Sequence, residues 1–432
     1  MRVLLVGSGG REHALAVTLG RSPMLDALFI APGNPGTAAL GTNVAIAVDD
    51  VPALVEFALR ERIGLVVPGP EAPLVAGLAD ACAVAGIACA GPTAQAARLE
   101  GSKSFTKTIC DAAGIPTARW ERFENADEAH AFVRRRGAPI VIKADGLAAG
   151  KGVVVAQTLA EAEAAIDMMM RDGGLGVAGA SVVIEECLDG DEVSLFAFCD
   201  GETALLIGAA QDHKRIGEGD TGPNTGGMGA VSPPAYFDRA TQETALDLLV
   251  RPMLREMVRL GTPFRGVIFA GLMLTVHGPE LIEYNVRFGD PEAQALLPRL
   301  RTDLLPVLVA LCDGRLAEAD LRFADEASVA VVLAGRGYPG RPATGGAIAG
   351  IERAERLPGV QVFQAATRRG PAGALYGDGG RVLTVVATAP DLAAARDAAY
   401  AGVAAIDWPD GIWRRDIGLR ALARADAAQA GD

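Results

Sequence analysis

Short apolar runs alternate with amphipathic stretches along the first hundred residues. The predicted strands cover residues 2–6, 27–31, 65–67 and 87–90, and the predicted helices begin near Glu12 and cover 52–61 and 74–85. This strand–helix alternation predicts an α/β domain over residues 1–101, with a Rossmann-like, doubly wound parallel sheet. Ligands of such sheets lie beyond the C-terminal ends of the strands.

The pattern changes after residue 101. Two α+β segments, 102–190 and 191–325, and a small α+β domain, 326–425, are expected to follow, with 426–432 as a tail. Predicted strands cover 139–143, 153–156, 181–187, 192–199, 266–274, 280–288, 328–334 and 381–387, and predicted helices cover 102–113, 158–170, 241–260, 302–314 and 392–406. Residues 211–234 lack apolar periodicity and are expected to form a long functional loop without regular structure. The alanine-rich end after Ala421 is expected to fray.

Composition excludes several classes of protein. Half of the 432 residues are apolar, enough for real cores, and the net charge of −13 argues against broad nucleic-acid or anionic-membrane binding. No apolar run approaches the ~18–20 residues of a membrane span, and the first is too short for a secretory signal. The six cysteines form no CxxC pair and are read as reduced thiols of a cytoplasmic protein. The four histidines show no metal-binding spacing.

A glycine turn follows the first strand. Gly7, Gly9 and Gly10 begin a dinucleotide fingerprint, but Arg11 to His13 follow where the third glycine is required. The amides of a helix N-terminus still favour an anion. A phosphate-type ligand, a structural tight turn and a dinucleotide therefore remain open.

Two lysines near residue 150 suggest phosphate binding. The loop 146–152 carries Lys151 but lies between two strands and departs from the Walker A spacing, so it is either a flap over phosphates or a plain hairpin. Lys143 ends an apolar strand, where an unpaired ammonium is costly to bury. It either reaches solvent or is held against a nucleotide phosphate.

Acidic residues mark two strands. Glu185 and Glu186 follow an apolar run, so one of them is expected to face inward. In the strand 281–288, alternation puts Ile282 and Tyr284 on an apolar face and Glu283, Asn285 and Arg287 on the opposite one. Two oxygen ligands at i and i+2 beside a cation suit Mg²⁺ bridging phosphates.

Eight motifs in order resemble one family. They are GSGGREH (7–13), GPEAPL (69–74), LEGSK (99–103), KADGLAAGKG (143–152), QDHKR (211–215), DTGPNTGGMG (220–229), EYNVRFGDPEAQ (283–294) and RDIG (415–418). This combination resembles the phosphoribosylamine–glycine ligases of the ATP-grasp superfamily. The resemblance implies a Rossmann-like domain, a central ATP-grasp clamp of two α+β subdomains and a small C-terminal α+β domain.

The resemblance also implies the reaction. ATP, glycine and 5-phospho-β-D-ribosylamine give N1-(5-phosphoribosyl)glycinamide, ADP and phosphate through glycyl phosphate, in the second step of de novo purine synthesis. Phosphorylation gives the carboxylate a leaving group, so positioning and charge neutralisation suffice without a protein nucleophile. The loops 146–152 and 211–229 are expected to close over the intermediate.

The implied roles fall on residues that match the family motifs. ATP is expected to contact Lys103, Lys143, Gly150, Lys151, Glu185, Glu186, Leu188 and Glu192. Mg²⁺ or Mn²⁺ is expected at Glu283 and Asn285. Arg287, Asp212 and Lys214 are the expected catalytic residues, and Gly9, Gly10, Glu71, Gly289 and Asp290 the expected substrate-binding residues.

Some alternatives stay open. The strand 269–274 contains no acid for a second metal, which would rest on Glu283, Asn285 and phosphate oxygens. The competing functions are another ATP-grasp carboxylate–amine ligase or carboxylase of purine metabolism, a non-catalytic nucleotide sensor, a nicotinamide dehydrogenase and a thiol catalyst. The expected partners are the small-molecule substrates, with a monomeric chain that contacts the preceding amidotransferase transiently.

Overall fold

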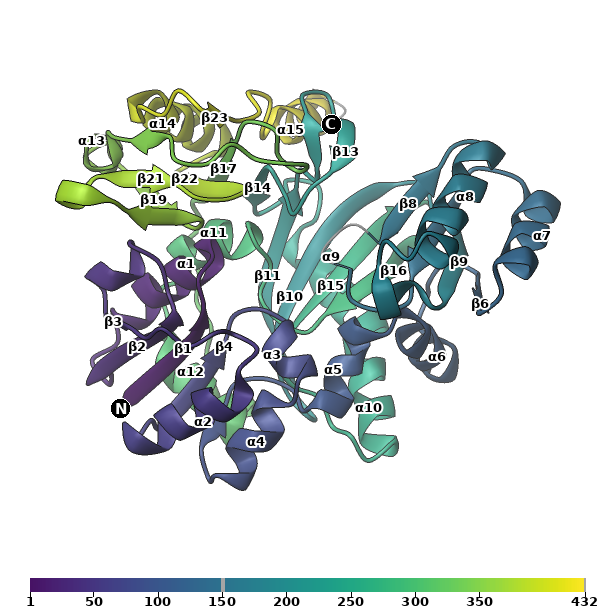
Figure 1. The fold of residues 1–432 in the computed structure, drawn as a ribbon, viewed down its shortest axis with the longest axis horizontal. Coiled ribbons are helices and arrows are strands. Elements are labelled where there is room, and N and C mark those ends of the chain that lie inside the picture. Colours follow the sequence, from purple (N-terminus) through teal and green to yellow (C-terminus); the bar gives the residue numbers. More distant parts are fainter. Residues whose placement is uncertain (149–151, 431–432) are drawn as a thin grey trace.

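The N-terminal unit is a doubly wound parallel sheet, as the strand–helix alternation predicts (Figure 1). In the computed structural model, which describes residues 1–148 and 152–430, its strand order is β3-β2-β1-β4-β5 and every pairing is parallel. The strands are β1 (Arg2–Gly7), β2 (Ala27–Pro32), β3 (Thr42–Asn43), β4 (Leu65–Pro68) and β5 (Ala88–Cys89). The helices are α1 (Gly10–Leu19), α2 (Val51–Arg60), α3 (Ala72–Val75), α4 (Leu78–Val84) and α5 (Ala94–Gly101).

Both faces of this sheet are buried. Leu5 of β1 packs with Leu15 of α1, whereas its neighbour Leu4 packs with Leu54 of α2 on the opposite face. The single helix predicted over 74–85 is divided into α3 and α4, because Gly77 between them has φ of 91°.

The second unit is an antiparallel sheet that forms a separate lobe in Figure 1. Its strand order is β6-β9-β7-β8, and its apolar core is shared with α7 and α8. Ser102 accepts a hydrogen bond from the Phe105 amide and thereby caps α6, the helix that leads into this lobe. The elements are α6 (Lys103–Ala113), β6 (Trp120–Phe123), α7 (Ala126–Arg136), β7 (Ile140–Ala144), β8 (Val153–Ala156), α8 (Leu159–Ile166) and β9 (Val182–Glu186). The predicted helix over 158–170 continues past α8 only as a π-helical turn over Asp167–Arg171.

A long antiparallel sheet joins the central and C-terminal parts of the chain. Its order is β16-β15-β10-β11-β14-β17-β22-β19, with β23 paired to β17. Because β14 pairs with β17, the sheet is continuous across the boundary expected near residue 326. The strands are β10 (Asp191–Asp200), β11 (Ala204–Asp212), β14 (Gly229–Ser232), β15 (Arg265–Thr275), β16 (Gly278–Asn285), β17 (Ala327–Gly335), β19 (Val360–Gln364), β22 (Arg381–Ala389) and β23 (Gly411–Ile412).

Helices cover this sheet. The side facing the N-terminal unit packs against α12, and the C-terminal strands pack against α14. The predicted helix over 241–260 is interrupted by a π-helical segment, Leu246–Val250. The helices are α9 (Arg239–Ala245), α10 (Arg251–Arg259), α11 (Glu292–Leu296), α12 (Leu304–Asp313), α13 (Ile351–Glu355), α14 (Leu392–Ala405) and α15 (Leu419–Ala430). A small sheet contains β18 (Ala347–Ile348), β20 (Thr367–Arg369) and β21 (Leu375–Gly377).

Two predictions from the polarity pattern were wrong. Residues 211–234 are not structureless: they contain the end of β11, a hairpin of β12 (Arg215–Gly217) and β13 (Thr221–Asn224), and β14. The hairpin is mostly polar and exposed, so no apolar alternation marks its strands. The alanine-rich end, expected to fray, forms α15. Among the residues described, no helix combines the length and apolarity that crossing a bilayer requires.

Gly7 offers a test of the turn between β1 and α1. Its φ is 133°, and a Cβ atom there would lie 2.4 Å from Cγ of Glu12. We expect Gly7→Ala to lower the free energy of unfolding by about 2 kcal/mol or more, seen as a lower thermal midpoint. Gly64→Ala is the matched control, since its Cβ would lie 3.1 Å from Cγ of the flexible Met1 side chain and 3.7 Å, an ordinary contact distance, from the Arg2 carbonyl oxygen. Equal midpoints for the two variants would contradict this account.

Candidate functional site

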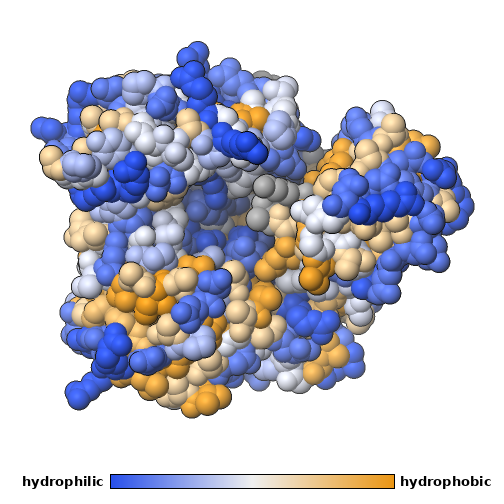
Figure 2. All heavy atoms as spheres, in the orientation of Figure 1, coloured by the Kyte–Doolittle hydropathy of each residue, from blue (hydrophilic) through white to orange (hydrophobic). Residues whose placement is uncertain are grey.

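A cavity of about 730 Å³ lies where the four parts of the chain meet. Figure 2 shows the hollow between the lobes, with hydrophilic residues at its bottom. Thirteen residues predicted for the site line it: Glu71, Lys103, Lys143, Glu185, Glu186, Leu188, Glu192, Asp212, Lys214, Glu283, Asn285, Arg287 and Asp290. Gly150 and Lys151 lie outside the described residues.

Three predicted glycines are not part of the lining. The Gly9 amide donates to Glu12 Oε2 (2.6 Å). A Cβ at Gly10 would lie 2.6 Å from Nε2 of Gln294, and one at Gly289 would lie 2.4 Å from Oε2 of Glu292. Close packing therefore accounts for all three glycines, which favours the structural-turn reading of the N-terminal glycines.

The buried carboxylate of Glu185 pairs with two lysine ammonium groups. Oε2 of Glu185 lies 2.9 Å from Nζ of Lys143 and 3.0 Å from Nζ of Lys107. All three side chains are at most 4% exposed, so Glu185 is the inward-facing acid of its pair, as expected. This pairing contradicts the reading in which Lys143 reaches solvent, because its ammonium is buried and paired; its contact with a nucleotide phosphate stays a prediction. Burial lowers the pKa of Lys107, although Glu185 raises it.

The three polar residues that alternation predicts for one face lie on β16 (Glu283 and Asn285) and two residues past its end (Arg287). Glu283, Asn285 and Arg287 all line the cavity. The apolar face differs from the prediction, because the register shifts between β15 and β16 and leaves Ile282 without a partner on β15. Leu281 is therefore the buried residue beside Tyr284, while Ile282 lines the cavity and its carbonyl accepts from Lys143 (3.1 Å).

Arg287 joins β16 to the N-terminal unit. Its Nε donates to Glu71 (3.1 Å), and its Nη2 donates to Glu100 (2.9 Å) and to Oδ1 of Asn285 (3.1 Å). Burial alone would lower the pKa of Arg287, but Glu100 and Glu71 raise it. Burial raises the pKa of Glu100 to about 7, although Arg287 opposes this. The second oxygen of Glu100 accepts from the Val286 amide (2.7 Å). The Glu100 carboxylate is therefore hydrogen-bonded both to the main chain just after β16 and to the guanidinium of Arg287.

A second cluster of charged side chains lies around Lys214. Its ammonium pairs with Glu192 at the start of β10. Burial and the charge of Glu292 raise the pKa of Asp212, whose Oδ1 is buried without a hydrogen-bond partner. Burial would raise the pKa of Asp290, but Arg381 and Arg11 lower it. The cavity therefore contains both Asp212, whose pKa is raised, and Asp290, whose pKa is lowered.

Several charged residues of the lining carried no predicted role. Arg11, Glu100, Lys107, Glu292 and Arg381 all line the cavity. Arg11, Glu100 and Glu292 lie inside the motifs quoted above, and Lys107 is one helical turn from Lys103 in α6, so local signals existed for these four. Arg381 comes from β22, where it donates to the carbonyls of Gly226 and Asp290. No local signal marks it, because its partners Asp290 and Gly226 lie 91 and 155 residues away in the sequence.

The same family matches three consecutive parts of the chain. The descriptions are "Phosphoribosylglycinamide synthetase, N domain" over residues 1–100, the "ATP-grasp (A) domain" over 101–293 and the "C domain" over 328–420. The chain belongs to the phosphoribosylglycinamide synthetase family. This confirms the resemblance and the ATP-grasp architecture expected from it.

Relatives cover the chain from end to end. A phosphoribosylamine–glycine ligase of Brucella melitensis is 53% identical over 427 residues, which cover 99% of this chain and 100% of the relative. A chloroplastic phosphoribosylamine–glycine ligase of Arabidopsis thaliana is 48% identical over 97% of this chain and 80% of its own length.

Solved structures agree with this assignment. The crystal structure of a phosphoribosylamine–glycine ligase from Thermotoga maritima superposes with a TM-score of 0.84 at 31% identity, covering 96% of this chain and 100% of the other. The biotin carboxylase domain of a Hydrogenobacter thermophilus 2-oxoglutarate carboxylase has a TM-score of 0.72 at 15% identity, over 95% and 91% of the two chains. The second likeness shows a shared fold alone.

His213 supplies a prediction on pH dependence. Burial and the nearby Arg414 lower its pKa from 6.5 to about 4. Because the unfolded chain binds this proton near pH 6.5, His213 lowers the stability of the folded protein as pH falls from about 6.5 towards 4. An NMR titration, with the resonance assigned through His213→Gln, should show a neutral imidazole at pH 5.5. A midpoint near 6.5 would contradict the burial argument.

Proposed function

We propose that this chain ligates glycine to 5-phospho-β-D-ribosylamine at the expense of ATP. The products are N1-(5-phosphoribosyl)glycinamide, ADP and phosphate, in the second step of de novo purine synthesis. The observation that carries the proposal is the end-to-end match to phosphoribosylamine–glycine ligases at about half identity. The cavity supports it, since it gathers cations and acids from every part of the chain.

The chemistry needs no protein nucleophile. The γ-phosphoryl group passes from ATP to the glycine carboxylate, which gives ADP and glycyl phosphate. The amine of phosphoribosylamine then attacks the carbonyl carbon, the C–O bond to phosphate breaks, and the amine loses a proton. Positioning and charge neutralisation in a dry cavity supply the catalysis.

ATP is proposed to lie between the second lobe and the central sheet. The main chain near Glu185, Glu186 and Leu188 would border the adenine, and Glu192 would accept from ribose hydroxyls. Lys103 and Lys143 would face the phosphates; Nζ of Lys103 lies 3.5 Å from the Gly146 carbonyl, at the start of the loop expected to close. Closure of that loop would keep water from the intermediate.

The donor set fits a divalent cation. Glu283 and Asn285 present carboxylate and amide oxygens, the ligands that Mg²⁺ and Mn²⁺ favour. The Nδ2 atom of Asn285 is buried without a partner, while its Oδ1 accepts from Arg287. No group of three or more His, Cys, Asp or Glu within residues 1–148 and 152–430 could hold a metal by itself. A cation here would therefore complete its shell with phosphate oxygens and water, and would neutralise charge on the phosphates.

The acceptor side is proposed to use the residues around Arg287. Its guanidinium would neutralise charge on the glycine carboxylate or on the phosphoryl group in transfer. Asp212, whose pKa is raised by burial and Glu292, is suited to take the proton that the attacking amine releases. Lys214, Glu71 and Asp290 would complete the glycine and amine sites.

The proposals for oligomeric state, location and partner are those that the sequence predicts. We propose a monomer that works in the cytoplasm and receives its unstable amine substrate through transient contact with the preceding amidotransferase. Size-exclusion chromatography coupled to light scattering, alone and with that amidotransferase, would test the monomer and the contact separately.

The decisive experiment measures ADP release by the purified protein. MgATP, glycine and phosphoribosylamine, formed in situ from ribose 5-phosphate and ammonia, would be omitted in turn, with mass detection of the product. We expect ADP release to require all three and glycinamide ribonucleotide to form. A protein that binds ATP but releases no ADP with fresh substrates would instead be another ATP-grasp ligase.

Glu283 is the sharpest single test of the cation site. Glu283→Gln keeps the shape of the side chain and removes its charge, so we expect kcat/KM to fall about a hundredfold or more. The matched control is Glu280→Gln on the same strand, outside the cavity lining. Activity of the Glu283 variant within threefold of the control would remove Glu283 from the site.

A further inference from the structure

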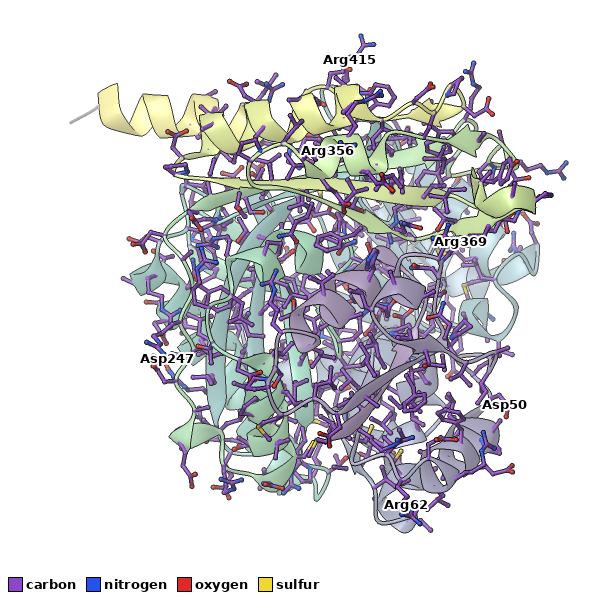
Figure 3. The ribbon with its side chains drawn as sticks, turned by 90° about the vertical axis from the view of Figure 1, so that its left-hand side faces the viewer. Asp50, Arg62, Asp247, Arg356, Arg369 and Arg415 are labelled. Atoms are coloured by element: carbon purple, nitrogen blue, oxygen red, sulfur yellow. The ribbon has the colours of Figure 1, made fainter. Side chains whose placement is uncertain are left out.

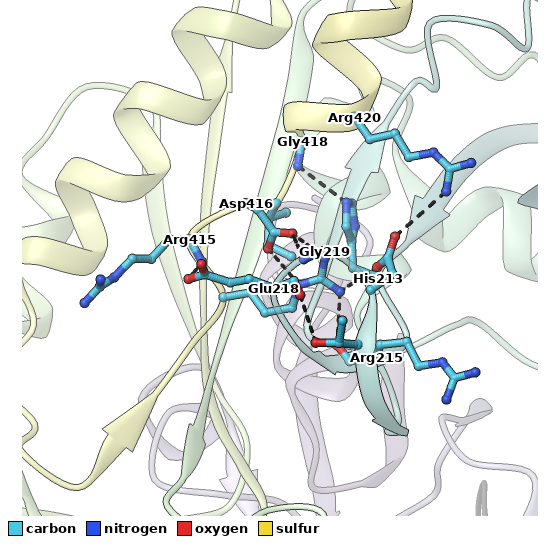
Figure 4. Close-up of polar contacts among 12 residues, drawn as sticks. His213, Arg215, Glu218, Gly219, Arg415, Asp416, Gly418 and Arg420 are labelled. Carbon is cyan, nitrogen blue, oxygen red and sulfur yellow. Dashed lines mark hydrogen bonds and ion pairs between the residues drawn. The ribbon is translucent and has the colours of Figure 1, made fainter.

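A segment near the C-terminus holds the polar hairpin at the cavity. We name residues 414–420 the C-terminal strap and residues 215–224 the cavity hairpin. Figure 4 shows the strap and the hairpin meeting through a set of hydrogen bonds and ion pairs. Four hairpin residues take part, although strap and hairpin are about two hundred residues apart in sequence.

Arg414 is the centre of these contacts. Its Nη1 donates to the carbonyl of Arg215 (3.1 Å) and to Oδ1 of Asp220 (2.7 Å). Asp416 accepts from Nε (2.8 Å) and Nη2 (2.7 Å) of the same guanidinium and also from the Gly219 amide (2.8 Å). The Arg414 guanidinium therefore connects the first strand of the hairpin to its turn.

Arg414 is buried, whereas its neighbour Arg415 is exposed. The Arg414 side chain is 2% exposed, whereas the side chain of the next residue, Arg415, points away from the protein (Figure 3). Arg415 reaches the hairpin only through its main-chain amide, which donates to Glu218 (3.2 Å). A buried guanidinium needs partners, and the hairpin supplies two of them.

The strap is itself fixed from behind by α14. The hydroxyl of Tyr400 donates to the Arg414 carbonyl (2.8 Å) and accepts from the Ile417 amide (3.1 Å). Arg396 donates to the carbonyls of Ile417 (3.0 Å) and Arg415 (2.6 Å). The strap is therefore a rigid support.

Apart from its contacts with the strap, the cavity hairpin has few interactions that stabilise it. It has two short strands, most of its residues are exposed, and an isolated two-stranded hairpin is marginal in water. Yet it adjoins the chemistry, because Asp220 and Asn224 line the cavity. The Thr225 amide (2.7 Å) and hydroxyl (2.8 Å) both donate to the carbonyl of Lys214, whose ammonium pairs with Glu192.

We propose that Arg414 is a positioning residue that keeps the cavity hairpin closed and so holds Lys214 against Glu192, the acid proposed to accept from the ribose of the nucleotide. The residue acts through the hairpin and touches no substrate. The identity of the nucleotide rests on the function proposed above, but the closure of the hairpin does not. If only the closed hairpin binds nucleotide, the apparent dissociation constant rises in proportion as the closed fraction falls.

The test compares Arg414→Lys and Arg414→Ala with Arg415→Lys as the matched neighbour. Three readouts apply to each: hydrogen exchange of residues 215–224 without ligand, MgADP binding by calorimetry, and the separate values of kcat and KM for ATP. We expect Arg414→Ala to speed exchange in the hairpin at least tenfold, and to raise the MgADP dissociation constant and the KM for ATP about tenfold. We expect kcat to change less than threefold. Arg414→Lys should lie between this variant and wild type, and Arg415→Lys should match wild type.

A second variant covers the case in which Arg414→Ala does not fold. Asp220→Asn weakens the same contact from the hairpin side, so it should give the same defect and should not add to Arg414→Lys in the double variant. Wild-type exchange and MgADP affinity in Arg414→Lys and Asp220→Asn, or additive effects in the double variant, would overturn the proposal. Lack of ligase activity in wild type, with the exchange and MgADP results as expected, would reject the proposed function and keep the positioning role.

Discussion

The cavity depends on one constraint: charges removed from water must be paired or must remain available for a ligand. Arg287 shows this most clearly, since its guanidinium lies between Glu71 and Glu100 of the N-terminal unit and Asn285 of the central sheet. These contacts bring the two parts of the chain together at the point where phosphates and substrates are proposed to meet. Breaking such a buried pair by removing one partner usually costs several kcal/mol, so the geometry is strongly held.

The same constraint separates the two ends of the cavity. Near the second lobe, the one carboxylate of Glu185 is shared by two buried lysines, which leaves a net positive charge there. Near β11, Asp212 has a buried oxygen without a partner and a raised pKa. The first arrangement suits the binding of an anionic nucleotide and the second suits proton transfer.

Much of the fold and of the candidate site could be predicted from the sequence, because the relevant signals are local. Apolar runs marked the strands of the N-terminal sheet except the two-residue β3, and alternation placed Glu283 and Asn285 of β16 on one face with Arg287 just beyond it. The failures have physical causes. The hairpin of β12 and β13 packs through hydrogen bonds instead of apolar side chains, and the bulge at Ile282 is set by pairing with β15. Arg381 acts across 91 and 155 residues and Arg414 across about two hundred, and no local pattern predicts such contacts.

The continuous sheet has a consequence for how the protein is made. Strand β14 pairs with β11 on one side and with β17 on the other, and β17 follows about a hundred residues later in the chain. On the ribosome, β14 therefore presents a bare edge until the C-terminal strands emerge. A chain that stops before β17 keeps that edge permanently and can add strands from other chains. Premature termination thus leads to aggregation as well as to loss of the site.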